Sequence, residues 1–227
     1  MARNGGVTSA IAPSALVADG IGPPPIAMQE LRERPLQLRG SRWARRVLRM
    51  AGWQVDFDGL PGPQGVLIVY PHTSNWDFIV GLLAKWAMGL SVTFWGKESL
   101  FRVPLFGHWL RWLGGVPVDR RGARGAVGDM VARMRQARSD GRLLWLALAP
   151  EGTRAWAPRW RSGFYQVARG ADVPLALVHL DYGRRRVGVH SYVQLGGDVA
   201  ADMAEIERRL GASRGLRPTQ AAPIRLH

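Results

Sequence analysis

Apolar and polar positions alternate along the chain in blocks that predict both strands and helices. Compact apolar runs at residues 65–70 (GVLIVY) and 143–149 have the length of buried strands. Because strands alternate with helices, we expect an α/β fold whose central sheet is covered by helices on both faces. The other predicted strands are at residues 92–95, 174–179 and 187–193, and the helices at 78–88, 105–113, 127–138, 163–169 and 202–210.

The two ends of the chain lack such periodicity. Residues 1–40 are broken by glycine and proline and have no strongly basic start, so we predict a disordered leader rather than a signal peptide. Residues 41–211 carry the periodic blocks and are predicted to form one domain. Residues 212–227, which follow Gly211, are predicted to be a frayed tail.

The predicted domain begins with a short basic amphipathic helix at residues 42–53. Trp43, Val47 and Met50 recur at helical spacing and are expected to form its apolar side. A tryptophan beside a cluster of arginines suits a helix that lies on an anionic membrane. The arginines on its other side are Arg42, Arg45, Arg46 and Arg49.

The overall charge also indicates an anionic partner. The 227 residues include 31 lysines and arginines against 17 acidic residues, a net charge of +14. All of these basic residues are arginines except Lys85 and Lys97. Such a balance predicts binding to a phosphate group, a nucleic acid or an acidic membrane.

Residue types that are absent or frequent narrow the choice further. The chain has no cysteine, which excludes disulfides, thiolate metal sites and a cysteine nucleophile. No apolar run approaches the roughly 20 residues that span a bilayer, so we expect a soluble or peripheral protein. Four of the ten tryptophans lie in apolar or arginine-rich stretches that suit a membrane interface, namely Trp109, Trp112, Trp156 and Trp160.

A histidine and an aspartate follow the predicted strand at residues 65–70. In the sequence PHTSNWD, Ser74 and Asp77 have the spacing of a helix N-cap and its acidic partner. His72 then lies in the loop and Asp77 in the first helical turn. A bent loop can place the carboxylate on one ring nitrogen and leave the other for a substrate hydroxyl, as acyl transfer requires. Taken alone, the pair also fits a capping aspartate beside an ordinary loop histidine.

Further candidate residues follow other predicted strands. Residues 150–154 (PEGTR) combine a glycine, which lets the backbone approach a ligand, with an arginine that can bind phosphate. Alone, Glu151 and Arg154 could also form an ion pair in a turn. Arg120 ends a glycine-containing stretch, and Lys97 follows the strand at residues 92–95. The other internal histidines, His108, His179 and His190, are predicted to be structural.

Together these blocks resemble the glycerolipid acyltransferase family, whose best-known members acylate 1-acylglycerol-3-phosphate. Residues 71–77 resemble its N-H-x-S-x-x-D block, and residues 150–154 match its P-E-G-T-R block. Residues 114–120 resemble its G-x-x-F-I-x-R block, and residues 173–175 its final V-P block. Two positions differ from the family pattern, because prolines replace its asparagine and its aromatic residue at Pro71 and Pro117.

The resemblance implies a single domain with a mixed central sheet flanked by helices, as in glycerol-3-phosphate acyltransferases. The donor would be acyl-CoA or acyl carrier protein, with no metal or other cofactor, and the acceptor a lysolipid, most simply 1-acylglycerol-3-phosphate. The enzyme would be cytoplasmic and bound to the anionic inner face of the cytoplasmic membrane. By the same resemblance, His72 would be the general base, Asp77 its orienting group, Glu151, Gly152, Thr153 and Arg154 the residues that position the head group, and Lys97 and Arg120 the ligands of its phosphate.

Three alternatives stay open. The acceptor could be a lysolipid without a phosphate, such as a lyso-ornithine lipid. The chain could be a basic nucleic-acid-binding protein, although its arginines are scattered and accompany no recognisable nucleic-acid motif. It could also be an inactive lipid-binding relative, against which the presence of both His72 and Asp77 argues.

Overall fold

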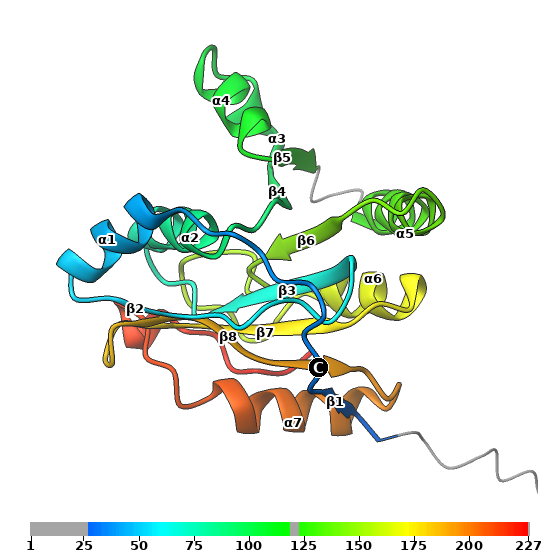
Figure 1. The fold of residues 1–227 in the computed structure, drawn as a ribbon. Helices are drawn as coiled ribbons and strands as arrows, with labels where there is room; N and C mark the ends of the chain where they lie inside the picture. The colour runs from blue at the N-terminus through cyan, green and yellow to red at the C-terminus, as the bar shows by residue number, and fades with distance from the viewer. Residues whose placement is uncertain (1–26, 119–122, 227) are drawn as a thin grey trace, which may run out of the picture.

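A mixed sheet of eight strands forms the centre of the computed structural model, which describes residues 27–118 and 123–226 (Figure 1). The strand order is β1-β8-β7-β3-β6-β4-β5, and β2 pairs with β8. The strands from β7 to β5 in this order are parallel, whereas β8 is antiparallel to β7 and to β1. The strands are β1 (Gln29–Leu31), β2 (Gln54–Asp56), β3 (Gln64–Tyr70), β4 (Val92–Lys97), β5 (Gly115–Val118), β6 (Leu144–Leu148), β7 (Leu175–Asp181) and β8 (Arg186–Gln194).

Helices flank this sheet, which confirms the predicted fold class. One face packs against α1 (Arg42–Met50) and α2 (Trp76–Met88), and the other against α5 (Ala123–Ser139), α6 (Gly163–Ala171) and α7 (Val199–Leu210). Two short helices, α3 (Glu98–Phe101) and α4 (Phe106–Trp112), lie beside the edge strand β5 and project away from the rest of the molecule (Figure 1). A single 3-10 turn, η1 (Pro218–Gln220), follows α7.

The central strand β3 is buried on both sides because its side chains alternate between two cores. Val66 and Ile68 pack in the core beneath α5, α6 and α7, whereas Leu67 packs in the core beneath α1 and α2. Gly65 lies flat against the ring of Trp145, since a Cβ atom at this position would come within 2.3 Å of it. A continuous apolar run is therefore required of β3, as its sequence predicts.

The parallel strands bring the predicted functional loops to one edge of the sheet. Residue Ile68 of β3 is in register with Leu148 of β6, so the loops that follow these two strands lie side by side. The first loop carries His72 and the second carries Glu151. The carboxyl ends of parallel strands are where α/β proteins bind their ligands, which makes this edge the place to look for a site.

Parts of both chain ends that were predicted to be unstructured are packed against the domain. Residues 27–40 are not part of a disordered leader, because β1 pairs with β8 and Leu36 bridges Leu60, while residues 1–26 lie outside the described part. The expectation of a frayed tail is wrong for residues 212–226, because Ala222, Ile224 and Leu226 are buried in the core. These segments lack a periodic pattern because they are held by single buried side chains and backbone hydrogen bonds.

The side of the first helix that packs against the domain is not the predicted apolar side of Trp43, Val47 and Met50. Helix α1 buries Ala44 and Leu48, one turn apart, whereas Trp43 is 63% and Met50 74% exposed. These two buried side chains are enough to hold α1 in place because the helix packs closely on α2. Trp160, expected at a membrane interface, is instead a core residue whose ring packs at a tilt against that of Tyr70, with the ring centroids 5.2 Å apart. Over the residues that the structure describes, no helix has the length and apolarity to cross a membrane.

Candidate active site

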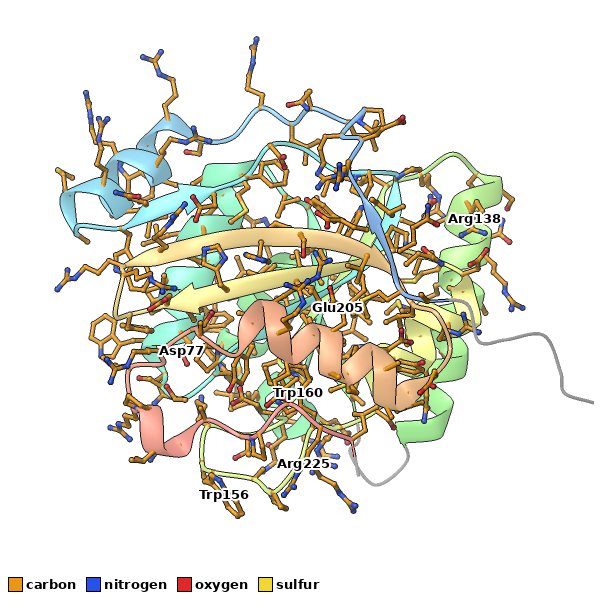
Figure 2. The ribbon with its side chains drawn as sticks, turned by 90° about the horizontal axis from the view of Figure 1, so that it is seen from below. Asp77, Arg138, Trp156, Trp160, Glu205 and Arg225 are labelled. Carbon is orange, nitrogen blue, oxygen red and sulfur yellow. The ribbon has the colours of Figure 1, made fainter. Side chains whose placement is uncertain are left out.

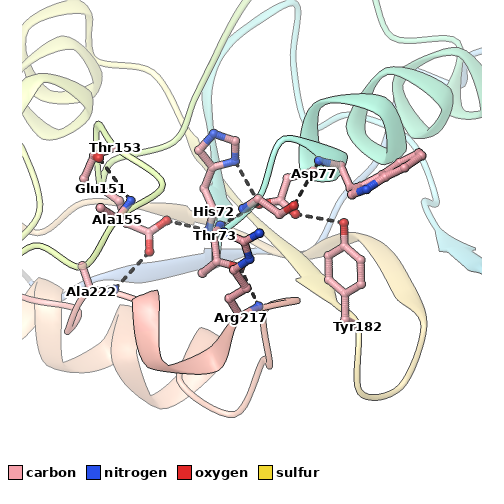
Figure 3. A network of polar contacts seen from close by, with 11 residues as sticks. His72, Thr73, Asp77, Glu151, Thr153, Ala155, Tyr182, Arg217 and Ala222 are labelled. Carbon is pink, nitrogen blue, oxygen red and sulfur yellow. Dashed lines mark hydrogen bonds and ion pairs between the residues drawn. The ribbon is translucent and has the colours of Figure 1, made fainter.

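The side chains of His72 and Asp77 meet at the carboxyl end of β3 (Figure 3). His72 lies in the loop and Asp77 in the first turn of α2, and the ring Nδ1 is 3.2 Å from Oδ2 of the carboxylate. The bent loop that the sequence pattern predicts is therefore present. Asp77 is almost completely buried, whereas the His72 side chain is 25% exposed, so a substrate can reach the ring.

Several donors hold the Asp77 carboxylate in its charged form. Its Oδ2 accepts hydrogen bonds from the backbone N–H of Thr73 at 2.6 Å and of Ser74 at 2.8 Å. Its Oδ1 accepts a hydrogen bond from the Tyr182 hydroxyl at 2.9 Å. Burial alone would raise the pKa of Asp77, but the bonds from His72, Ser74 and Tyr182 outweigh it and lower the pKa below its ordinary value. An anion therefore faces the imidazole.

Helix α2 begins one residue later than the capping pattern predicts. Asn75 occupies the N-cap position without a capping side-chain bond, while the Ser74 Oγ accepts a hydrogen bond from the Trp76 N–H at 3.2 Å. The carboxylate of Asp77 reaches back to the Ser74 N–H, as the acidic partner of a capping box does. The predicted contact between Ser74 and Asp77 forms, although the helix begins one residue later than predicted.

A second aspartate in the fold holds a loop in a similar way without a histidine. Asp202, in the first turn of α7, accepts the backbone N–H groups of Gly196 and Gly197, each at 3.0 Å, and the Tyr165 hydroxyl at 2.7 Å. Two loop amides and a tyrosine hydroxyl thus hold Asp202 much as they hold Asp77. The difference is the histidine, which accompanies only the aspartate at the edge where the functional loops meet.

Glu151 joins the loop after β6 to the histidine loop. Its side chain is buried, and Oε2 accepts the His72 N–H at 2.5 Å while Oε1 accepts the Ala222 N–H at 3.1 Å. Burial raises the pKa of Glu151 to about 7, although both N–H bonds act to lower it. Instead of an ion pair with Arg154, this carboxyl group makes a bridge to the backbone of the histidine.

The residues after Glu151 form a tight turn. Gly152 has a φ of +67°, a backbone conformation that favours glycine, and a Cβ atom there would displace the side chain of Arg161. The Thr153 hydroxyl accepts the Ala155 N–H at 3.2 Å, which leaves the Arg154 side chain directed to solvent. The turn therefore offers an accessible guanidinium group.

The two remaining predicted phosphate ligands are less closely placed. Lys97 is exposed at the end of β4, on the same edge of the sheet. Because β4 continues past β6 to pair with β5, Lys97 lies beyond the end of β6. Arg120 lies outside the described residues. Of the histidines predicted to be structural, His179 bonds Asp56 at 2.9 Å rather than Asp181, and His108 and His190 are exposed.

The sequence patterns missed the residues that complete the site from the C-terminal part of the chain. Tyr182 lies in the turn between β7 and β8, and the contact of Ala222 uses only its backbone N–H. Arg217 also contributes a backbone N–H, which donates to the Thr73 Oγ1 at 3.2 Å (Figure 3). No motif marks these positions, because they act through a lone hydroxyl or through backbone groups.

A metal site would need clustered ligands. Within residues 27–118 and 123–226, histidine, aspartate and glutamate side chains form no group of three or more that could hold a metal ion. The chemistry that the side chains of the site themselves offer is that of a general base with an anionic partner.

Comparison with known proteins gives one family and one solved structure. The family model described as Acyltransferase matches residues 54–179. The crystal structure of the 1-acyl-sn-glycerophosphate (LPA) acyltransferase PlsC from Thermotoga maritima aligns with 16% identity and a TM-score of 0.48, covering 74% of this chain and 73% of that chain. No curated protein matches the sequence.

Proposed function

This chain belongs to the acyltransferase family, and we propose that it moves a fatty acyl group from a thioester to the hydroxyl of a lysolipid. The observation that carries the proposal is the His72–Asp77 pair. Because Nδ1 of the ring faces the buried carboxylate, Nε2 is the nitrogen left for a substrate. A base in this arrangement needs no nucleophile from the protein, since the acceptor hydroxyl supplies it.

The reaction follows from this placement. Nε2 of His72 takes the proton of the acceptor hydroxyl while the oxygen attacks the thioester carbonyl. The tetrahedral intermediate then collapses, the carbon–sulfur bond breaks, and the departing thiolate takes the proton from the imidazolium. Asp77 stabilises the imidazolium between these two steps, because it is held as an anion by three donors besides the ring.

For the acceptor we propose 1-acylglycerol-3-phosphate. Arg154 supports this choice, because its exposed side chain extends from the turn next to the histidine loop and a guanidinium group binds phosphate well. Lys97, exposed at the end of β4, would add positive charge on the same edge of the sheet. By the family resemblance, Arg120 would be a further phosphate ligand. The donor would be acyl-CoA or acyl carrier protein, both anionic, which suits a net charge of +14.

The substrate would be reached at a membrane surface. Large apolar side chains are exposed on α4, with Leu105 at 86% and Trp112 at 75%, and on the first turn of α2, where Trp76 is 64% exposed. We call this surface the apolar ridge, and it includes Phe106, Trp109 and Ile79. Contact between the Phe78 and Trp109 rings, with centroids 6.0 Å apart, joins its two parts.

The apolar ridge adjoins the catalytic pair, because Trp76 directly precedes Asp77 in α2. An exposed apolar surface of this kind suits contact with lipid. Helix α1 adds Trp43 and Met50 together with its exposed arginines. We therefore propose peripheral binding to the inner face of the cytoplasmic membrane.

A product screen tests the proposed function. The protein would be incubated with acyl-CoA or acyl carrier protein as donor and with lysophosphatidic acid or lyso-ornithine lipid as acceptor, and products would be detected by mass spectrometry. We expect diacyl product from lysophosphatidic acid, and a raised acceptor KM in Arg154→Ala. Product from lyso-ornithine lipid alone would instead assign the phosphate-free acceptor, and absence of any product would contradict the proposal.

A further inference from the structure

The C-terminal segment, residues 212–226, crosses the edge of the sheet that carries the catalytic pair. After α7 the segment turns at η1 and runs back along the underside of the molecule toward Trp160 and Arg225 (Figure 2). Its end is anchored by the buried side chains of Ile224 and Leu226. The matched family region ends at residue 179, so this segment lies outside it.

One part of the C-terminal segment contacts the histidine loop. Gly215 packs so closely against Thr73 that a Cβ atom would come within 2.6 Å of its Oγ1. The Arg217 N–H donates to the same Oγ1 at 3.2 Å. Thr73 is completely buried and directly follows His72, so these contacts fix the backbone on one side of the base.

Another part of the C-terminal segment contacts the loop of Glu151. The Ala222 N–H donates to Oε1 of Glu151, whose other oxygen accepts the His72 N–H. The Tyr70 hydroxyl donates to the Ala222 carbonyl at 3.2 Å, which holds this part of the segment at the end of β3. The segment and the histidine are thus tied to the two oxygens of one buried carboxyl group.

Gln220 contacts both loops at once. With its amide oriented so that the nitrogen faces the two carbonyls, its side chain donates to the Thr73 oxygen and to the Arg154 oxygen, each at 2.9 Å. One residue therefore joins the loop of the base to the turn that presents the acceptor-binding arginine. A spacing between two loops is held best by a group that bonds to both of them.

We propose that the C-terminal segment sets the distance between the catalytic histidine and the acceptor-binding turn, with Gln220 as the positioning residue that links them. This inference rests on the proposed function, because it assigns the base to His72 and the acceptor contact to Arg154. Displacement of a reacting group by about 1 Å can lower turnover about 100-fold without loss of the fold. The segment then governs turnover although none of its residues takes part in the chemistry.

Paired substitutions in the full chain test the proposal. Gln220→Met removes the amide donors at nearly constant length, and Gln220→Lys restores a donor. Gln194→Met is the matched control, because Gln194 also bonds by its side chain, to Asp172 at the C-cap of α6. A second pair, Gly215→Ala and Gly128→Ala, adds a methyl group against Thr73 or into open space on α5.

Two measurements are made on each variant. The first is kcat and KM for donor and acceptor, expressed per mole of folded protein. The second is amide hydrogen exchange in the peptide that contains residues 72–77, which reports the loop whether or not the protein is an acyltransferase. A wild-type protein without transferase activity would contradict the proposed function. Slow amide exchange in residues 72–77 of the same protein would still allow the contacts of the C-terminal segment to be tested.

The proposal expects a specific split between variants. Gln220→Met and Gly215→Ala should lower kcat at least about 10-fold and raise exchange in residues 72–77, with smaller changes in donor KM, while Gln220→Lys recovers most of the turnover. Gln194→Met and Gly128→Ala should match the wild type. Normal kcat per folded molecule in Gln220→Met and Gly215→Ala, including a loss of activity that only tracks unfolding, would overturn the proposal.

Discussion

Tyr182 donates a hydrogen bond from its hydroxyl to Oδ1 of Asp77, at 2.9 Å, while Oδ2 of the same carboxylate faces the His72 ring. The tyrosine also packs edge-on against Trp53, with ring centroids 4.9 Å apart, so its hydroxyl is held in one place. Its backbone N–H donates to the Arg214 carbonyl of the C-terminal segment. The carboxylate beside His72 is therefore itself oriented by a residue from the end of the neighbouring parallel strand, β7.

Removal of this hydroxyl should affect catalysis more than stability. Tyr182→Phe takes one donor from a buried anion, a loss of roughly 1.5–3 kcal/mol for a bond to a charged group, and should lower kcat about 10-fold. The matched control is Tyr165→Phe, which removes the same kind of bond from Asp202. Both variants should melt earlier than the wild type, but only Tyr182→Phe should lose turnover. Equal activity in both would show that Tyr182 is structural.

The charge of Asp77 should matter beyond its capping contacts. Asp77→Asn keeps an acceptor for the loop amides but removes the anion that stabilises the imidazolium, so kcat should fall on the order of 100- to 10,000-fold with a smaller change in acceptor KM. Asp202→Asn, in the parallel network without a histidine, should lower the melting temperature and leave kcat unchanged. If Asp77→Asn behaves like Asp202→Asn, Asp77 is only a capping residue.

The buried carboxyl group of Glu151 predicts a pH dependence of stability. Its pKa is raised from 4.5 to about 7, so between these values the folded protein binds more protons than the unfolded chain. The contribution of Glu151 to stability should therefore fall as the pH rises from 4.5 to 7, by at most about 1.4 kcal/mol per pH unit, and should be constant above pH 7.

Denaturant unfolding of the wild type and Glu151→Gln over this pH range measures the effect. The contribution of Asp77, whose pKa is lowered, acts in the opposite direction at more acidic pH and is common to both proteins. The free energies of unfolding should therefore converge or cross as the pH rises to 7, with the wild type losing more. Parallel curves would show that Glu151 ionises at its ordinary pKa.

Membrane binding should separate into two components. Replacement of the four arginines of α1 by glutamine removes about 1 kcal/mol each near an anionic surface, a component that salt screens. Replacement of Leu105 and Trp112 in the apolar ridge by serine should remove a component that salt does not weaken. Sedimentation with anionic vesicles at low and high salt distinguishes the two, and turnover of a monomeric short-chain acceptor should stay normal in both variants. A wild-type protein that ignores anionic vesicles at low salt would contradict membrane binding.

Sequence patterns predicted the parts of the fold that rest on periodicity. The apolar run of β3 and the spacing of Ser74 and Asp77 are local, and they placed His72 in a loop and Asp77 in a first helical turn. The two loops met because parallel strands share an edge, which also follows from the order of strands and helices. Local rules thus predicted the placement of His72 and Asp77.

The remaining contacts could not be predicted from the sequence because they are not local. Tyr182 is 105 positions from Asp77, and a single tyrosine in a turn carries no signal of its partner. Ala222 and Arg217 act through backbone N–H groups, which every residue except proline has. The buried side of α1 could not be predicted for a related reason, since Ala44 is buried by close packing on α2 and not by its own hydrophobicity.

Turnover of His72→Ala is the most direct test of the central claim that this histidine is the base for acyl transfer. His190→Ala is the matched control, because His190 is exposed on β8 and has no part in the site. With a thioester donor and a monomeric lysolipid, His72→Ala should lose on the order of 100- to 10,000-fold in kcat while its melting temperature stays close to that of the wild type, and His190→Ala should turn over normally. A folded His72→Ala protein with the turnover of the wild type would contradict the account.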